Sequence, residues 1–263
     1  MHRDSSEKPI GIIAALESEI AGLRREMARG DLRSEDRGRI VEGTIGGRRV
    51  LLARSGIGPD RAARTARRLL QGNGLDALLS IGYTGGTVDR LRPGDLVIAE
   101  EVLSLDGMPA EKGPAPGVTG RLSSDSRLVE KAREAAAVGS MRFHVGVMAT
   151  LGEPANSPDL KRRIGEDLGV CSVEMESAAV AGAAAAASVP FVAIRTVSDR
   201  LGRRLPSRDE IKFWESKKRS PSIFLAALTR PVLFAEMLIL WMGLRVASAR
   251  LNRFIIDYIS KLG

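Results

Sequence analysis

Short apolar runs rich in β-branched residues alternate along this chain with segments whose apolar residues recur at helical spacing. The run IGIIAA at 10–15 is followed by the helical pattern LESEIAGLRREMARG, and the alternation continues to the apolar run 190–199. Two strand-like runs within 40–54 are joined by a Gly-Gly pair at 46–47, which is a hairpin signal. This order predicts a mixed, twisted central sheet with helices packed on it. Residues 107–121 are rich in glycine and proline, which predicts a loop.

The length and composition limit the kind of protein. A chain of 263 residues with 44% hydrophobic residues is long enough for one large α/β domain or two small ones. The single cysteine, Cys171, excludes an internal disulfide, and two histidines leave no Cys/His metal site, so we expect no metal and no cofactor. The segment MHRDSSEKPIGIIAAL has acids and a proline where a signal peptide needs an apolar run. These features predict a cytoplasmic protein.

The chain is basic, with a formal net charge of +8. Such a charge fits binding to nucleic acid, contact with an anionic membrane surface, or a solvated basic face. Aromatic residues make up only 4% of the chain and are not interleaved with basic ones, so we expect no nucleic acid partner. The membrane surface and the solvated face both stay open.

The composition changes near residue 217, and we predict a catalytic domain over residues 1–216 and a basic, amphipathic helical tail over 217–263. Charged residues interrupt the apolar runs of the tail well before the roughly 20 residues that a membrane-spanning helix needs. One helical stripe of the tail is apolar: Leu244, Ala247, Leu251, Phe254, Ile255, Tyr258, Ile259 and Leu262. Two interpretations fit this stripe, namely packing onto the protein's own core or a second subunit, and contact with a membrane surface.

Two glycine-rich turns, SGIGP at 55–59 and GYTGG at 82–86, follow strand-like runs. SGIGP lacks the third glycine of the dinucleotide fingerprint, and no GK[ST] follows it as in a phosphate loop. No Gly-x-Ser-x-Gly motif of a serine hydrolase is present. We expect the glycines to let the backbone approach a ligand closely, because open α/β sheets bind ligands at strand ends.

Carboxylates collect where apolar runs end. Glu17 and Glu19 follow IGIIAAL, Glu174 and Glu176 lie in VEMES, and Asp199 ends VAIRTVSD. Acids at a helix N-terminus are also simply favourable for the helix, and this explanation alone would account for VEMES. Three separate segments that each deliver an acid to a strand end instead indicate a sheet-based active site.

Six ordered segments between about residues 10 and 200 resemble the purine nucleoside phosphorylase and methylthioadenosine/S-adenosylhomocysteine nucleosidase superfamily. They are IGIIAALESEI, ARSGIGPDRAA, LLSIGYTGG, LRPGDLVIAEEV, VEMESAAVA and VPFVAIRTVSD. The resemblance implies a three-layer α/β/α sandwich with a mixed central sheet, at least a homodimer, and cleavage of the N-glycosidic bond between a purine and a ribose.

The resemblance also implies roles for single residues. Glu19 corresponds to the acid that activates the attacking water, and Asp199, with Ser198 beside it, to the acid that protonates the departing purine at N7. Glu176 corresponds to the carboxylate that holds the ribose hydroxyls, and Met175 to the residue packed under the sugar. The other positions that the resemblance places around the ribose and base are Thr84, Gly85, Ala155 and Glu174. A carboxylate near the sugar and an acid at the leaving group both favour an oxocarbenium-like transition state.

The attacking group is water or phosphate. The family's phosphorylases carry an arginine where this chain has Ser80, and IAALESEI has an acid in place of their phosphate-binding glycine turn. A carboxylate there would repel phosphate, which favours hydrolysis, although Arg54 stays an alternative phosphate ligand.

The chain departs from the ordinary nucleosidases at Tyr83, where a small serine is usual, and at Pro154, where an aromatic residue stacks on the base. It is more similar to the hopanoid-associated branch in VEMES, in RRLP at 203–206 and in LTRPVL within the tail. That branch releases adenine from adenosylhopane to give ribosylhopane, and a basic, apolar tail would suit a peripheral membrane position near such a lipid. The alternatives are a methylthioadenosine/S-adenosylhomocysteine nucleosidase, a phosphate-dependent phosphorylase and a catalytically silent nucleoside-binding protein.

Overall fold

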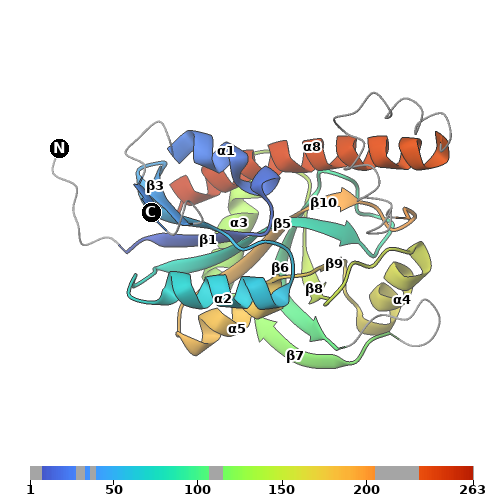
Figure 1. The fold of residues 1–263 in the computed structure, drawn as a ribbon, viewed down its shortest axis with the longest axis horizontal. Coiled ribbons are helices and arrows are strands. Elements are labelled where there is room, and N and C mark those ends of the chain that lie inside the picture. The colour runs from blue at the N-terminus through green and yellow to red at the C-terminus, as the bar shows by residue number, and fades with distance from the viewer. Residues whose placement is uncertain (1–7, 28–32, 36–39, 107–114, 205–230, 263) are drawn as a thin grey trace.

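The computed structural model describes residues 8–27, 33–35, 40–106, 115–204 and 231–262 (Figure 1). The strands are β1 (Ile10–Ala14), β2 (Arg33–Glu35), β3 (Ile40–Ile45), β4 (Arg48–Arg54), β5 (Ala77–Gly86), β6 (Leu96–Leu105), β7 (Val118–Ser123), β8 (Phe143–Thr150), β9 (Ser172–Glu174) and β10 (Phe191–Asp199). The helices are α1 (Glu17–Met27), α2 (Pro59–Leu70), α3 (Ser126–Val138), α4 (Pro158–Leu168), α5 (Ser177–Ala186) and α8 (Pro231–Ser260).

The described strands form one mixed sheet in the order β10-β6-β8-β9-β5-β1-β4-β3-β2, with β7 paired to β6. Strand β1 runs parallel to β4 and β5, and β10 runs parallel to β5 but antiparallel to β6. Because β10 pairs with both β5 and β6, and β9 with both β5 and β8, these strands close into a circuit at one side of the sheet. The parallel strands β1, β5 and β10 therefore bring their carboxyl ends to one edge.

Helices cover both faces of the sheet, which confirms the predicted three-layer α/β/α architecture (Figure 1). One hydrophobic cluster joins the sheet to α1, α3 and α8, and a second joins its opposite face to α2 and α5. The predicted hairpin is also confirmed, since Gly46 and Gly47 connect β3 to β4 with φ of 56° and 85°. Positive φ at both turn positions matches the right-handed twist of paired strands and favours glycine.

The predicted loop 107–121 is wrong at its end, where β7 begins at Val118. Strand β7 pairs antiparallel with β6 and its first residues are exposed, so backbone hydrogen bonds rather than apolar burial define it. The sequence gives little hydrophobic alternation there, which is why composition indicated a loop. Residues 107–114 of the prediction lie outside the described residues.

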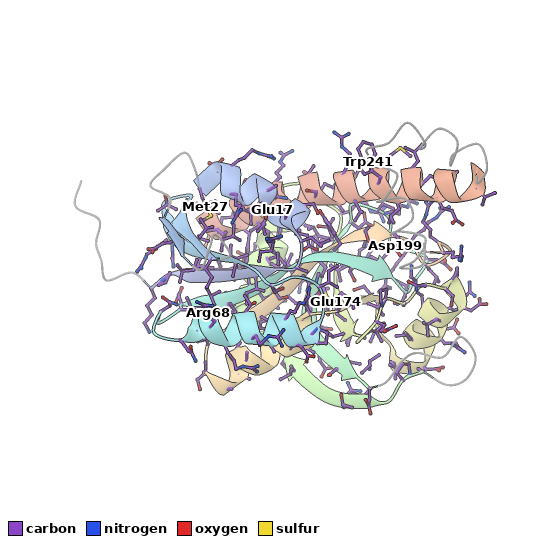
Figure 2. All side chains as sticks on the ribbon, in the orientation of Figure 1. Glu17, Met27, Arg68, Glu174, Asp199 and Trp241 are labelled. Carbon is purple, nitrogen blue, oxygen red and sulfur yellow. The ribbon has the colours of Figure 1, made fainter. Side chains whose placement is uncertain are left out.

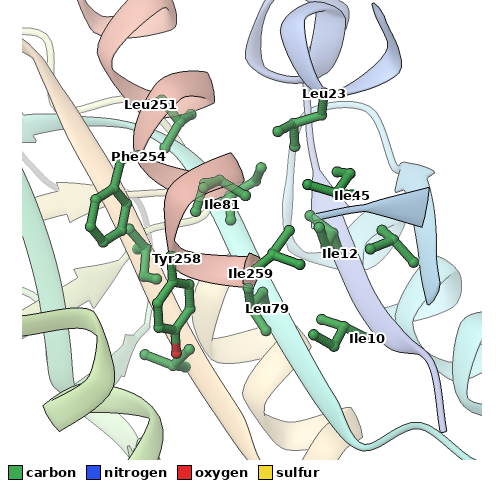
Figure 3. Packing of buried hydrophobic residues seen from close by; sticks show 14 of the residues in the cluster. Ile10, Ile12, Leu23, Ile45, Leu79, Ile81, Leu251, Phe254, Tyr258 and Ile259 are labelled. Atoms are coloured by element: carbon green, nitrogen blue, oxygen red, sulfur yellow. The ribbon is translucent and has the colours of Figure 1, made fainter. Parts of the chain in front are cut away.

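Helix α8 packs along the sheet beside α1 (Figure 1). Most of its apolar stripe is buried in the first hydrophobic cluster, namely Leu251, Phe254, Ile255, Tyr258 and Ile259. Ala247 is also fully buried, while Leu244 and Leu262 are half-buried. Figure 3 shows Leu251, Phe254, Tyr258 and Ile259 beside isoleucines of β1 and β5. Of the two interpretations of this stripe, packing onto the protein's own core is the one observed.

The N-terminal part of α8 is less buried than its end. Several large apolar side chains are exposed there: Val232, Leu238, Ile239, Trp241, Met242 and Val246. Trp241 projects from the outer side of the helix (Figure 2), and the guanidinium of Arg245 lies 4.6 Å from its ring centroid. Among the described residues, none of the helices has both the length and the hydropathy that crossing a membrane requires. The predicted boundary at 216/217 lies outside the described residues, as do parts of the RRLP and LTRPVL segments.

Candidate active site

The predicted acids come together at the carboxyl edge of the parallel strands. Glu19 lies in the first turn of α1 directly after β1, and Asp199 is the last residue of β10, paired in register with Gly85 of β5. Glu174 ends β9, and Glu176 is the N-cap of α5. The strand-to-helix alternation thus positions acids from distant segments at one edge, as open α/β sheets do at ligand sites.

A cavity of about 150 Å³ lies at this edge. Its walls include the predicted site residues Thr84, Gly85, Ala155, Glu174, Met175, Ser198 and Asp199. Tyr83 and Pro154, the two positions where the sequence departs from the ordinary nucleosidases, also line it. The departures therefore lie in the wall of the same cavity as the predicted site residues.

Glu19 is buried behind the cavity wall. The backbone N–H groups of Leu16 and Tyr83 donate to its carboxylate, at 2.7 Å to Oε2 and 3.0 Å to Oε1. Burial raises the pKa of Glu19, an effect that Arg195 and these backbone hydrogen bonds only partly oppose. A carboxylate with a raised pKa is a stronger base, as activation of water requires.

Arg195 is a site residue that the sequence reasoning missed. It projects from the middle of β10 with 2% of its surface exposed, and its Nη2 donates to Glu174 Oε2, to Ser80 Oγ at 3.0 Å and to Ser177 Oγ at 2.8 Å. A charge inside the apolar run FVAIRTVSD was the available signal, because a buried charge requires a partner. Ser80, at the phosphorylase arginine position, here accepts a hydrogen bond from Arg195.

Glu174 and Glu176 have different protonation behaviour. Although burial alone would raise it, the pKa of Glu174 is lowered by Arg195, by Thr150 and by backbone N–H groups at the start of α5. Burial and the charge of Glu174 raise the pKa of Glu176 to about 7. Glu176 Oε1 accepts a hydrogen bond from Gly58 N–H of the SGIGP turn at 2.8 Å.

Asp199 is buried in the cavity wall, with 2% of its surface exposed. Ser198 Oγ donates to its Oδ1 at 2.7 Å, and the ammonium of Lys161 donates to its Oδ2. Lys161 lies on α4 and was not predicted, since it looks like the neighbouring Arg162 and Arg163 in the sequence.

Arg54, the alternative phosphate ligand, lies elsewhere. It is half-exposed and its Nε is 3.7 Å from Glu17 Oε2. It lines a separate cavity of about 520 Å³ together with Arg61, Arg64 and Arg68 of α2. Within the described ranges, no group of three His, Cys, Asp or Glu residues is arranged to hold a metal ion.

Comparisons with known proteins identify the family of the chain. A sequence model described as "Phosphorylase superfamily" matches residues 9–230. The 5′-methylthioadenosine/S-adenosylhomocysteine nucleosidase of Geobacillus thermodenitrificans is 33% identical over 231 residues, which cover 83% of this chain and 95% of the relative. That of Haemophilus influenzae strain PittEE is 35% identical over 198 residues, covering 72% and 85%.

Solved structures are similar over nearly their whole length. The nucleosidase of Neisseria meningitidis in complex with methylthio-immucillin-A has a TM-score of 0.73 and 26% identity, and the match covers 96% of this chain and 99% of that one. Futalosine hydrolase of Helicobacter pylori has a TM-score of 0.74 at 19% identity, covering 96% and 97%, which shows a shared fold alone.

Proposed function

The chain belongs to the phosphorylase superfamily, and we propose that it is a purine nucleosidase that hydrolyses the N-glycosidic bond of a 5′-substituted adenosine. The observation that carries this proposal is the cavity at the strand ends. Asp199 lies in its wall, and Glu19 is hydrogen-bonded to the backbone of the wall residue Tyr83. A general acid and a general base are thereby available at one site.

In the proposed reaction the C1′–N9 bond breaks while Asp199 gives a proton to N7 of the purine. Water then adds to C1′ and loses a proton to Glu19, so that adenine and a free ribose hydroxyl result. Glu176 holds the ribose hydroxyls, and the carboxylates together favour the cationic sugar of the transition state. These roles rest on the resemblance. Asp199 lines the cavity, whereas Glu19 reaches it through its hydrogen bond to the backbone of Tyr83, and Glu176 follows the lining residue Met175.

Two observations favour water over phosphate as the attacking group. Arg195 Nη2 is already engaged by Glu174, Ser80 and Ser177. A phosphate dianion would also meet the buried carboxylates of Glu19 and Glu174, and like charges repel more strongly where water is excluded.

We extend the proposal to adenosylhopane as substrate and ribosylhopane as product, with the protein at a membrane surface. A second cavity, of about 360 Å³, shares Ser198 with the active site and is lined by Arg200, Arg203 and the exposed side of α8 at Ile239 and Met242. An apolar 5′ group leaving the ribose in this direction would meet apolar side chains flanked by cations, which suits a lipid–water interface. The homodimer and the tail domain beginning at residue 217 stay predictions.

A second candidate function is a methylthioadenosine/S-adenosylhomocysteine nucleosidase that never visits a membrane. It is favoured by the burial of the α8 stripe in the protein's own core, which removes that stripe from any lipid contact. Similar rates on small thioether nucleosides and no binding to anionic liposomes would support it. Loss of liposome binding in Trp241→Ser would instead support the lipid version.

Adenine release, measured by chromatography with and without phosphate, tests the proposal. The substrates are 5′-methylthioadenosine, S-adenosylhomocysteine and adenosylhopane in detergent micelles. We expect release without phosphate, and complete loss in Glu19→Gln and Asp199→Asn. Glu17→Gln is the matched control, because Glu17 is in the same helical turn but its side chain is 48% exposed. Absence of adenine from every substrate under both conditions would contradict the proposal.

A further inference from the structure

Lys161 is a lysine with no exposed surface whose ammonium contacts the predicted general acid. It lies in the first half of α4, a helix capped by Ser157, and its neighbours Leu160 and Ile164 pack in a hydrophobic cluster. Besides Asp199 Oδ2, its Nζ donates to the backbone carbonyl of Arg203 at 3.3 Å. Burying an ammonium is costly even when it is paired, so packing alone does not explain a lysine at this position.

The contacts of Asp199 come from both sides of its carboxyl group. Ser198 Oγ donates to Oδ1, while Lys161 donates to Oδ2 from a different element. Gly85 lies across from the pair, since a Cβ added there would be 3.1 Å from Asp199 Oδ2 and 3.5 Å from Lys161 Nζ. Two donors on separate elements fix the orientation of the carboxyl group, and the glycine keeps the space beside it open.

We propose that Lys161 is a positioning residue for glycosidic cleavage, which holds the Asp199 carboxyl group in place and supplies the proton that Asp199 passes to the purine. This inference rests on the proposed function. As the C1′–N9 bond breaks, its electron pair moves onto the purine and N7 takes a proton from Asp199. Asp199 takes a proton from the Lys161 ammonium, which becomes a neutral amine, and solvent later restores it.

Other titratable groups lie near the ion pair of Lys161 and Asp199. Tyr83, Glu153 and Glu174 line the same cavity, and Glu174 is paired with Arg195. Arg200 and Arg203 line the second cavity on the other side of Ser198. Among the described residues, Lys161 is the cation in an ion pair with Asp199.

The variant Lys161→Met tests the inference through the pH profile of adenine release. Removal of a proton source should lower kcat about 100-fold at about pH 8 and leave KM within about threefold. Without the lysine the proton must come from solvent, so the variant should recover part of its activity as the pH is lowered. Lys161→Arg keeps the charge but cannot release its proton, so it should resemble the methionine variant at high pH.

Ile164→Val is the matched control, because Ile164 is buried in the same helix and its side chain has no proton to donate. Its pH profile should equal that of the wild type. A loss of kcat in Lys161→Met that is constant with pH, or that is no larger than the loss in Ile164→Val, would overturn the proposed role of Lys161. The proposed function of the protein would still stand. An active Lys161→Arg at high pH would overturn the proton supply.

The wild type provides a measurement that does not depend on folding of a variant. Its kcat should stay level between about pH 6 and about pH 8, since a neighbouring donor supplies the proton to Asp199. A kcat that falls from about pH 6 upward, as for a lone carboxyl group, would contradict the inference. No adenine release at all would instead contradict the proposed function, and the inference with it.

Discussion

Replacement of Arg195 by methionine should destabilise the protein strongly, because one buried guanidinium neutralises a cluster of buried acids. Its Nη2 donates to Glu174, Ser80 and Ser177, and Glu176 Oε2 lies 4.0 Å away. Methionine fills similar space but leaves Glu174 without a counter-charge. The side chains of Arg195 and Glu174 are only 2% and 1% exposed, so water cannot replace the lost contact.

Breaking a buried ion pair by removing one partner costs about 3–5 kcal/mol. At roughly 2–4 °C per kcal/mol for a domain of this size class, Tm should fall by roughly 6–20 °C. The charge of Glu174 explains the loss, so the loss should depend on pH. The lowered pKa of Glu174 gives the wild type stability that is present above the ordinary value of 4.5 and is lost as pH falls.

In Arg195→Met the pH dependence of stability that Glu174 contributes has the opposite sign. Burial without Arg195 raises the pKa of Glu174, so the variant loses stability as pH rises above 4.5. Thermal unfolding followed by circular dichroism should therefore show a Tm difference that is large at about pH 7.5 and small at about pH 4.

Arg121→Met is the matched control. Arg121 also pairs with a glutamate on a neighbouring strand, Glu101 at 2.9 Å, but its side chain is 59% exposed. An exposed pair contributes about 0–1 kcal/mol, so the Tm of this variant should change little at any pH. The reasoning about Arg195 would be refuted by a Tm loss that matches that of Arg121→Met, or by one that is equal at both pH values.

Two further predictions concern the site. Because the pKa of Glu176 is raised to about 7, the carboxylate that holds the ribose should form as pH rises, and KM for the nucleoside should fall between about pH 6 and about pH 8. Glu176→Gln should abolish this pH dependence of KM. An unchanged dependence in the variant would assign it to another group. Gly82→Ala should lower both Tm and activity, because φ is 156° and the added Cβ would be 2.6 Å from the nearest side-chain atoms. Gly182→Ala on α5, whose added Cβ would have no neighbour from outside its own helix within 4 Å, should instead raise the free energy of unfolding by up to about 1 kcal/mol. A similar loss of Tm in both variants would count against the steric argument.

Local patterns were sufficient to predict the elements and the edge where the site lies. The run IGIIAA and the helical spacing after it correspond to β1 and α1. Acids at strand ends correspond to the observed positions of Glu19, Glu174 and Asp199, because parallel strands in one sheet share a carboxyl edge.

Long-range pairing was the part that sequence patterns did not contain. Lys161 is 38 residues from Asp199, and nothing in DLKRRIGEDL separates it from the arginines beside it. Strand β7 depends on hydrogen bonds to β6 rather than on its own composition. The sequence could not predict what the apolar stripe of α8 packs against, because an apolar helical face has the same pattern whether it contacts a core, a subunit or a lipid.

The burial of α8 has a consequence for synthesis of the protein in the cell. Ile10 and Ile12 of β1 share a hydrophobic cluster with side chains near the end of α8, and Ile259 lies toward them (Figure 3). At about 5–20 residues per second, translation leaves roughly 10–50 s between the appearance of β1 and that of its cover. During that time the apolar face of the sheet is open on the ribosome, so we expect nascent chains to be clients of ribosome-associated chaperones and to complete their core only when α8 has emerged.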